Sequence, residues 1–217
     1  MALHVAYFQP TIIAIDNVSP VEFSRLFNLV EQLHAHPELD DGKNPSTSIR
    51  GGQQIQVYPN DLNIDMKWLV DYLEVLCKGY MELVSKQSTT KDLEMCRPVV
   101  TSIWTIRQTE GAYQEMHSHP GGNLSGNIYI AAPELAIDSN PSDAQIAIRL
   151  PQTRDVTKFI MQDTWKYTPT PGTVLLFPSH LAHTVYPWRG MGHRTIVAFD
   201  ARLVPKDELL ETEQPNE

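Results

Sequence analysis

The sequence predicts a mainly β protein of the α+β class, in which helices come first and a series of short strands follows. Apolar residues at helical spacing are confined to the first 96 residues. After residue 97, β-branched and aromatic runs alternate with turn-forming residues. Many short strands joined by turns are typical of a sandwich or a barrel. We therefore expect one domain over residues 1–206, with helical support at 1–96 and a β core at 97–206.

Two helices are predicted in the first part. Ser19-Pro20-Val21-Glu22 matches a capping box, in which Ser19 caps the helix and Glu22 reaches back to the cap. Apolar residues then follow at helical spacing until Pro37. A second amphipathic helix is predicted to begin near Asp65. The segment between them, residues 38–60, is rich in Gly, Asn, Ser, Pro and Asp, which predicts a long surface loop.

The second part contains six strand candidates, recognised by β-branched, aromatic or alternating apolar residues. They are residues 99–107, 127–132, 146–150, 156–161, 173–177 and 194–204. Pro171-Gly172 suits a type II turn before one of them, because the second central position of that turn needs a positive φ. Residues 207–217 are acidic and polar, and we expect them to form a flexible tail.

Composition and charge exclude several classes of function. With 17 Lys and Arg against 26 Asp and Glu, the net charge is −9, and the basic residues are scattered. Nucleic acid and anionic membrane are therefore unfavourable partners. The chain has no long apolar run, the start has no signal-peptide pattern, and Cys77 and Cys96 lack metal-site spacing. These features predict a cytoplasmic protein.

The chain's eight histidines include two His-x-His-Pro strings, at 34–37 and 117–120. The first ends a helix, where residues two apart point in different directions and cannot easily share an ion. The second follows a predicted strand, where residues two apart lie on one face, so His117 and His119 can converge on one metal. Glu115 has the same parity and could join them or orient them.

A third ligand must come from elsewhere in the chain, and residues 169–187 supply two candidates, His180 and His183. Arg194 follows His183 by eleven residues, at the start of a new apolar strand. A guanidinium there can clamp a carboxylate with two parallel hydrogen bonds. It can equally be a surface charge at the edge of a barrel, and position alone does not choose between the two.

Taken together, these pieces resemble the iron(II)/2-oxoglutarate-dependent dioxygenases, in particular the prolyl-hydroxylase-like oxygenases of bacteria and phages. The residues that carry the resemblance are 114–120, 124–130, 171–179, 183–185 and 194–196. The resemblance implies a double-stranded β-helix, a jelly-roll or cupin-like barrel, with the N-terminal helices packed on one sheet. It implies that His117 is the first metal ligand and His183 the last. Arg194 would bind the distal carboxylate of 2-oxoglutarate (2OG), with Tyr129 and Asn127 beside that cosubstrate.

The sequence departs from the family pattern at the middle ligand. His119 stands where the family has a carboxylate, so the implied metal ligands are His117, His119 and His183. Neutral imidazole in that position makes the centre more positive by one charge, and three histidines also suit zinc. Glu115 is the alternative carboxylate ligand. Thr195 and Ile196 also depart from the family's Arg-x-Ser pattern, so a hydroxyl that assists Arg194 must come from elsewhere.

The implied activity is hydroxylation of a substrate C–H bond by iron(II), coupled to decarboxylation of 2OG to succinate, with ascorbate as a candidate reductant. A small molecule or a peptide is the expected substrate, and a homodimer is one candidate assembly. Two other classes remain open. One is a cupin-like metalloprotein, a dioxygenase or an isomerase, that uses three histidines without 2OG. The other is a binding module whose histidines are structural.

Overall fold

The structure is a computed structural model that describes residues 11–40, 48–57, 65–87, 92–151 and 164–208. The predicted strand at 156–161 lies outside the described residues. So do residues 209–217 of the predicted tail and parts of the predicted loop at 38–60.

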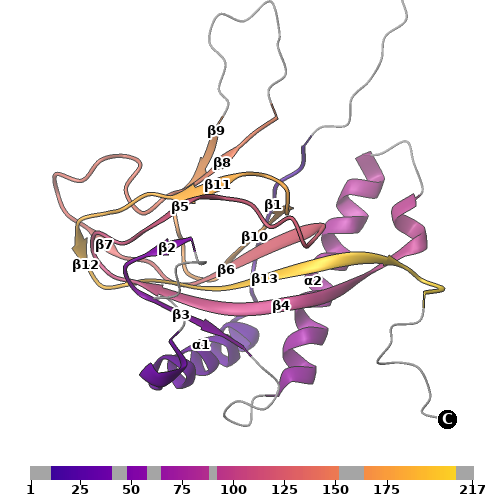
Figure 1. The fold of residues 1–217 in the computed structure, drawn as a ribbon, viewed down its shortest axis with the longest axis horizontal. Helices are drawn as coiled ribbons and strands as arrows, with labels where there is room; N and C mark the ends of the chain where they lie inside the picture. Colours follow the sequence, from indigo (N-terminus) through magenta and orange to yellow (C-terminus); the bar gives the residue numbers. More distant parts are fainter. Residues whose placement is uncertain (1–10, 41–47, 58–64, 88–91, 152–163, 209–217) are drawn as a thin grey trace, which may run out of the picture.

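Two antiparallel sheets form the body of the protein (Figure 1). The strands of the six-stranded sheet are, in spatial order, β1 (Ala14–Asn17), β10 (Thr173–Pro178), β6 (Leu124–Ala131), β13 (Arg194–Pro205), β4 (Cys96–Gln108) and β3 (Gln53–Gln56). Those of the five-stranded sheet are β2 (Ile49–Arg50), β5 (Tyr113–His117), β11 (His183–Val185), β8 (Ile146–Arg149) and β9 (Thr164–Tyr167). A two-stranded sheet joins β12 (Gly190–Met191) to β7 (Glu134–Leu135). The two large sheets face each other as in a double-stranded β-helix, which confirms the predicted fold class.

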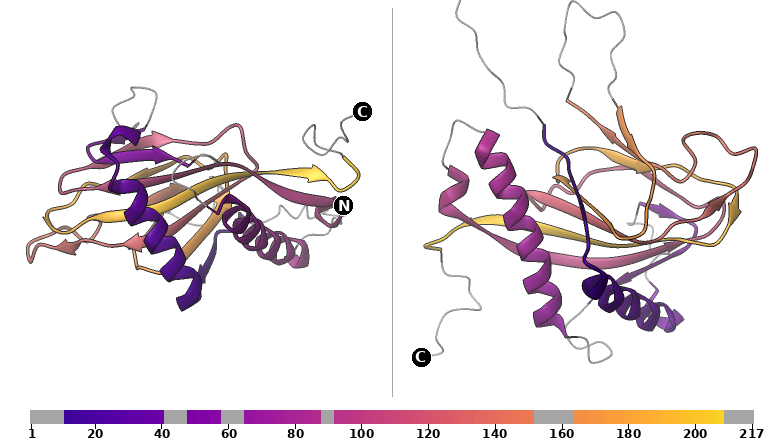
Figure 2. Two further views of the ribbon diagram at one scale, coloured as in Figure 1. Left: turned by 90° about the horizontal axis from the view of Figure 1, so that it is seen from below. Right: turned by 180° about the vertical axis from the view of Figure 1, so that it is seen from behind.

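The helices cover the outer face of the six-stranded sheet, as the views from below and behind show (Figure 2). They are α1 (Pro20–His34) and α2 (Met66–Gln87), with short 3-10 turns η1 (Pro37–Leu39) and η2 (Asp92–Met95). In the described residues, neither helix combines the length and the hydropathy that spanning a membrane requires.

The start of α1 confirms half of the predicted capping box. Ser19 is the cap, and its Oγ accepts a hydrogen bond from the Glu22 backbone N–H at 3.3 Å. Glu22 does not return to the cap. Its carboxylate instead accepts a bond from the indole N–H of Trp68 on α2, at 2.9 Å. The partly buried indole needs an acceptor, and this contact joins the two helices.

Two apolar cores follow from the alternation of side chains along the central strands. One core lies between the helices and the six-stranded sheet and includes Leu26, Leu73 and Phe199. The other lies between the two large sheets and includes Ile106 and Ile196. Because successive residues of a strand point to opposite faces, β13 contributes to both cores, with its even-numbered residues on the inner face.

The prediction of a surface loop over residues 38–60 is wrong where the structure describes that segment. Strand β2 pairs with β5, and β3 pairs with β4, so the segment adds an edge strand to each large sheet. Ile49 and Ile55 are buried, and the remaining residues of both strands are polar. Sequence patterning missed these strands because each is very short and carries only one buried apolar residue.

Five of the six predicted strands correspond to β4, β6, β8, β10 and β13. The predicted turn before β10 is also confirmed, because Gly172 has a φ of +85° and the Thr173 N–H donates to the Thr170 carbonyl at 3.1 Å. A positive φ at this position is what a type II turn requires.

The two histidines of the first His-x-His-Pro string lie in different surroundings. His34 is buried beneath α1, with Nδ1 3.1 Å from Gln53 Oε1 and Nε2 2.6 Å from Thr105 Oγ1. His36 instead contacts the Glu38 carboxylate on the surface. The string therefore serves to dock α1 on β3 and β4 and forms no metal site.

Burial lowers the pKa of His34 from 6.5 to about 4. Below pH 6.5 the unfolded chain therefore binds a proton that the folded chain excludes. This contribution to stability is fully present above about pH 6.5 and is lost as the pH falls towards 4. We expect the wild type to lose about 2 kcal/mol more than His34→Gln between about pH 7.5 and 5, measured by urea unfolding with a chelator present. Equal losses in the two proteins would contradict this account.

Candidate active site

His117 and His183 are placed opposite each other by the pairing of two strands. They end β5 and begin β11, and the antiparallel register pairs His183 directly with His117. Their ring centroids lie 4.2 Å apart. The contact joins residues 66 positions apart in the chain, so strand pairing alone brings these two imidazoles together.

His119 lies beside these two imidazoles, but it is not positioned by strand alternation as the sequence predicted. It lies two residues beyond the end of β5, so strand alternation does not orient it. Its backbone N–H donates to the Ser179 carbonyl at 2.8 Å, and its ring is stacked 5.4 Å from Trp104 and 5.2 Å from His183. The ligand nitrogens of the three histidines lie within 4.8 Å of one another, the one such cluster in the described part of the chain.

Each of these imidazoles has a hydrogen-bond acceptor at Nδ1. For His117 it is the Glu115 carbonyl at 2.7 Å, and for His183 it is the Leu181 carbonyl at 3.0 Å. For His119 it is Asp200 Oδ2 at 3.0 Å. Because these oxygens accept and do not donate, Nδ1 carries the proton in each ring and Nε2 is left with a free lone pair.

Burial also keeps two of these rings in the metal-binding form. It lowers the pKa of His117 below its ordinary value. It lowers the pKa of His183 to about 3, with a further contribution from the neighbouring His117. Neutral imidazoles with a free Nε2 are suitable ligands for iron or zinc, so the donor set fits a bound divalent metal.

The other ligand candidates lie away from this cluster. The Glu115 side chain is half exposed, and its carboxylate accepts a hydrogen bond from the Arg50 guanidinium at 3.0 Å. His180 is exposed on the turn after β10. The carboxylate nearest the cluster belongs to Asp200, which sequence reasoning did not single out. It is 9% exposed, and its Oδ1 accepts from Ser125 Oγ at 2.6 Å.

A second polar cluster surrounds Arg194, which is fully buried and so is not a surface charge at the barrel edge. Its Nη1 donates to Gln108 Oε1 at 2.8 Å, and its guanidinium lies 5.3 Å from the ring centre of Tyr129. Arg194 Nε and Nη2, Gln108 Nε2 and Tyr129 Oη have no hydrogen-bond partner among the described residues. Unsatisfied buried donors around a cation are costly, so this cluster fits an anion such as a carboxylate.

Tyr129 and Asn127 occupy the inner face of β6, as expected for residues two apart. Burial raises the pKa of the Tyr129 hydroxyl, which keeps it protonated and able to donate. Asn127 is 8% exposed and is paired with Ala198 of β13. Ala198 lies between Arg194 and Asp200 on that strand. Gln108 was missed from the sequence, although it lies opposite Arg194 in the register of β4 and β13.

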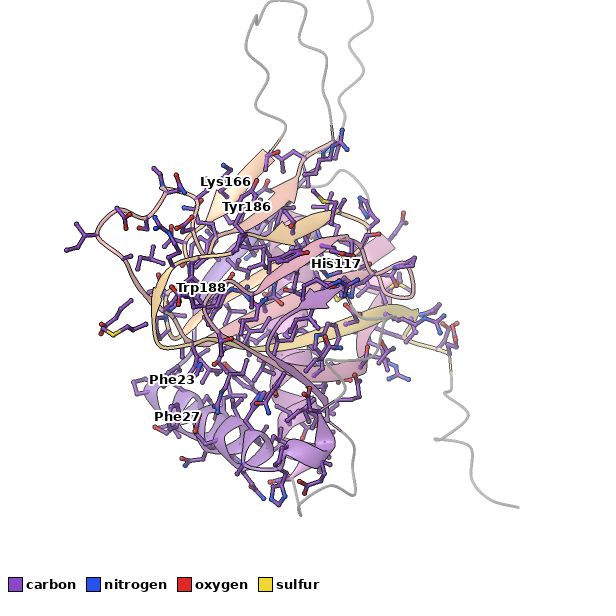
Figure 3. All side chains as sticks on the ribbon, turned by 60° about the vertical axis from the view of Figure 1, so that its left-hand side comes forward. Phe23, Phe27, His117, Lys166, Tyr186 and Trp188 are labelled. Atoms are coloured by element: carbon purple, nitrogen blue, oxygen red, sulfur yellow. The ribbon has the colours of Figure 1, made fainter. Side chains whose placement is uncertain are left out.

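A pocket of about 400 Å³ opens beside the histidine cluster. Its lining is rich in uncharged polar side chains, namely Ser48, Gln54, Gln56, Ser102, Gln114 and Ser118. Trp104 lines this pocket, whereas Trp188 is buried well away from His117 (Figure 3). Among the described lining residues, Asp200 is the sole carboxylate, and Lys and Arg are absent.

Comparison with solved structures supports the fold. A viral collagen prolyl hydroxylase from Paramecium bursaria Chlorella virus-1, in complex with 2OG, is 14% identical with a TM-score of 0.51, over 88% of this chain and 96% of that one. A prolyl hydroxylase from Trichoplax adhaerens, bound to a peptide fragment of hypoxia inducible factor, is 15% identical with a TM-score of 0.58, over 87% and 82%. HygX from Streptomyces hygroscopicus, with nickel, 2OG and hygromycin B bound, is 13% identical with a TM-score of 0.56, over 91% and 84%.

Comparison by sequence finds a similarity to one family. A search among curated proteins finds no match. The family described as "Putative 2OG-Fe(II) oxygenase" matches residues 102–200. That range contains the histidine cluster and Arg194. The match covers a little under half of the chain, and over those residues the chain is similar to the 2OG-Fe(II) oxygenases, as its motifs predicted.

Proposed function

We propose that this protein is an iron(II)- and 2OG-dependent dioxygenase in which His117, His119 and His183 hold the metal. The observation that carries the proposal is the pairing of two complementary sites inside one barrel. One offers three imidazoles whose Nδ1 atoms are hydrogen-bonded to protein oxygens, which leaves Nε2 for a metal, and the other a buried guanidinium with unsatisfied donors. When bound, iron(II) and 2OG supply the oxidising chemistry, which hydroxylates a substrate C–H bond and releases succinate and carbon dioxide.

The protein's own contribution at the metal end is to fix three donors and leave the remaining coordination positions open. The hydrogen bonds at Nδ1 hold each ring in one tautomer and one orientation. Three protein ligands would leave room at the metal for 2OG and oxygen. Trp104 stacks on His119 and limits the approach of water from that side.

At the other end, the distal carboxylate of 2OG would provide the missing acceptors for Arg194 Nε and Nη2, Gln108 Nε2 and Tyr129 Oη. The Gln108 amide would thus assist Arg194 in place of the serine hydroxyl of the Arg-x-Ser pattern, which this sequence lacks. Asn127, between this cluster and the metal end, would lie beside the same cosubstrate.

The pocket lining supports a substrate without strong charge, bound by amide and hydroxyl groups next to Trp104. A small molecule or a peptide meets this description. The Trichoplax prolyl hydroxylase was solved with a peptide and HygX with hygromycin B, so this fold accommodates bound ligands of both kinds.

The metal assignment is tested by substituting the ligands one at a time. We expect the wild type to retain about one divalent metal per chain after dialysis, and His117→Ala and His183→Ala to lose it, because two imidazoles bind much more weakly than three. Glu115→Gln is the matched control, and we expect it to retain the metal because its carboxylate is engaged with Arg50. Metal analysis of each folded protein decides this, and loss of metal in Glu115→Gln would make Glu115 the third ligand.

The cosubstrate assignment is tested by removing the buried cation while keeping its volume. We expect Arg194→Met to weaken 2OG binding by roughly 100-fold and Gln108→Leu by about tenfold, because hydrogen bonds to a charged group are lost in each. Metal affinity should not change in either variant. Calorimetric titration of 2OG into the metal-loaded protein and succinate release measure this effect. If 2OG binds neither the wild type nor the variants, the chain is a three-histidine metalloprotein that does not use 2OG.

A further inference from the structure

We propose that Asp200 is a positioning residue for the metal site and supplies, through His119, the negative charge that a carboxylate ligand would otherwise bring. The inference rests on the proposed function, because it assumes that His119 Nε2 faces a metal. The carboxylate of Asp200 contacts the Nδ1 of His119 at 3.0 Å, on the side of the ring opposite the ligand nitrogen.

The position of Asp200 is fixed from several sides. Its second carboxylate oxygen accepts from Ser125 Oγ at 2.6 Å, and its backbone carbonyl accepts from Thr101 Oγ1 at 3.2 Å. The register of β13 shifts directly after Asp200, and Ser125 lies opposite it on β6. The Asp200 side chain is 13% exposed, so little water competes with the imidazole for its carboxylate.

His119 differs in this respect from the other two rings. His117 and His183 rest on neutral backbone carbonyls, whereas His119 rests on a carboxylate. His119 also stands where the resemblance implies a carboxylate ligand, the third member of a triad of two histidines and one carboxylate. Two imidazoles with one carboxylate carry a charge of −1, and three imidazoles with Asp200 carry the same charge. The total charge of the two sets is therefore the same, but in this protein the negative charge lies on the far side of the His119 ring from the proposed metal.

A carboxylate behind a ligand imidazole does more than balance charge. It fixes the tautomer that presents Nε2, holds the ring in its plane and makes the ring a stronger electron donor. The stacked contacts of His119 with Trp104 and His183 restrict tilting of the ring but leave rotation within its plane to the hydrogen bond. Asp200 is thus the group that sets where His119 Nε2 points.

The experiment measures cobalt(II) and iron(II) affinity anaerobically against a chromophoric chelator, together with the cobalt(II) absorption spectrum. Asp200→Asn keeps the shape and removes the charge. We expect it to lower metal affinity by roughly 10- to 100-fold and to alter the spectrum. Glu115→Gln, which removes a nearby carboxylate that does not touch a ring nitrogen, is the matched control and should leave both unchanged.

The double variant His119→Asp with Asp200→Asn separates this role from general support of the fold. It moves the carboxylate back to the ligand position and keeps the total charge, so we expect it to recover most of the affinity lost in Asp200→Asn. A purely structural role for Asp200 would not be rescued by a change at position 119. Thermal unfolding without metal checks that each variant is folded.

Three results would overturn the proposal. The first is an unchanged affinity and spectrum in folded Asp200→Asn, and the second is a double variant no better than the single one. The third is loss of metal in Asp200→Asn but retention in His119→Ala, which would make Asp200 itself a ligand. Failure of the wild type to bind metal is a separate outcome, because it would remove the proposed function together with this inference.

Discussion

The inner face of β13 fixes the position of the Arg194 cluster relative to the histidine cluster, because it carries both Arg194 and Asp200. This strand is hydrogen-bonded on both sides, to β4 and to β6, so its register cannot shift without breaking two ladders. Arg194 and Asp200 lie six residues apart on this strand and are both buried, Arg194 beside Gln108 and Asp200 beside His119. Because side chains alternate with a period of two, a slip of one residue would replace them by Thr195 and Ala201.

The helical layer stabilises that strand from behind. Odd-numbered residues of β13, including Val197 and Phe199, pack in the core under α1 and α2. Gly126 on β6 leaves the space that the Phe199 ring fills, since a Cβ there would lie 2.2 Å from a ring carbon. The tight packing of the outer face therefore fixes the direction of the inner face, where the polar groups of the site project.

The electrostatics of the site depend on which charged groups are buried and which polar groups contact them. The guanidinium of Arg194 has one protein acceptor, Gln108, so much of its hydrogen-bonding capacity is left for a ligand. Of the three clustered imidazoles, His119 contacts a carboxylate, that of Asp200, whereas His117 and His183 contact backbone carbonyls. The barrel thus has a cationic end suited to a carboxylate and an imidazole cluster suited to a metal, with the Asp200 carboxylate one ring away from the Nε2 atom of His119.

The sequence alone determined what depends on short range: the two helices, the strands with strong β patterns, the turn at Gly172, and the spacing of His117, His183 and Arg194. The resemblance to a family then suggested a function, because these motifs follow one another along the chain in the order expected for that family. Only the tertiary structure decided which groups complete the site. Strand pairing and barrel closure bring Gln108 to Arg194 and Asp200 to His119. The Glu115 carboxylate instead accepts a hydrogen bond from Arg50. No local pattern encodes these contacts, because each joins residues more than 60 positions apart in the chain.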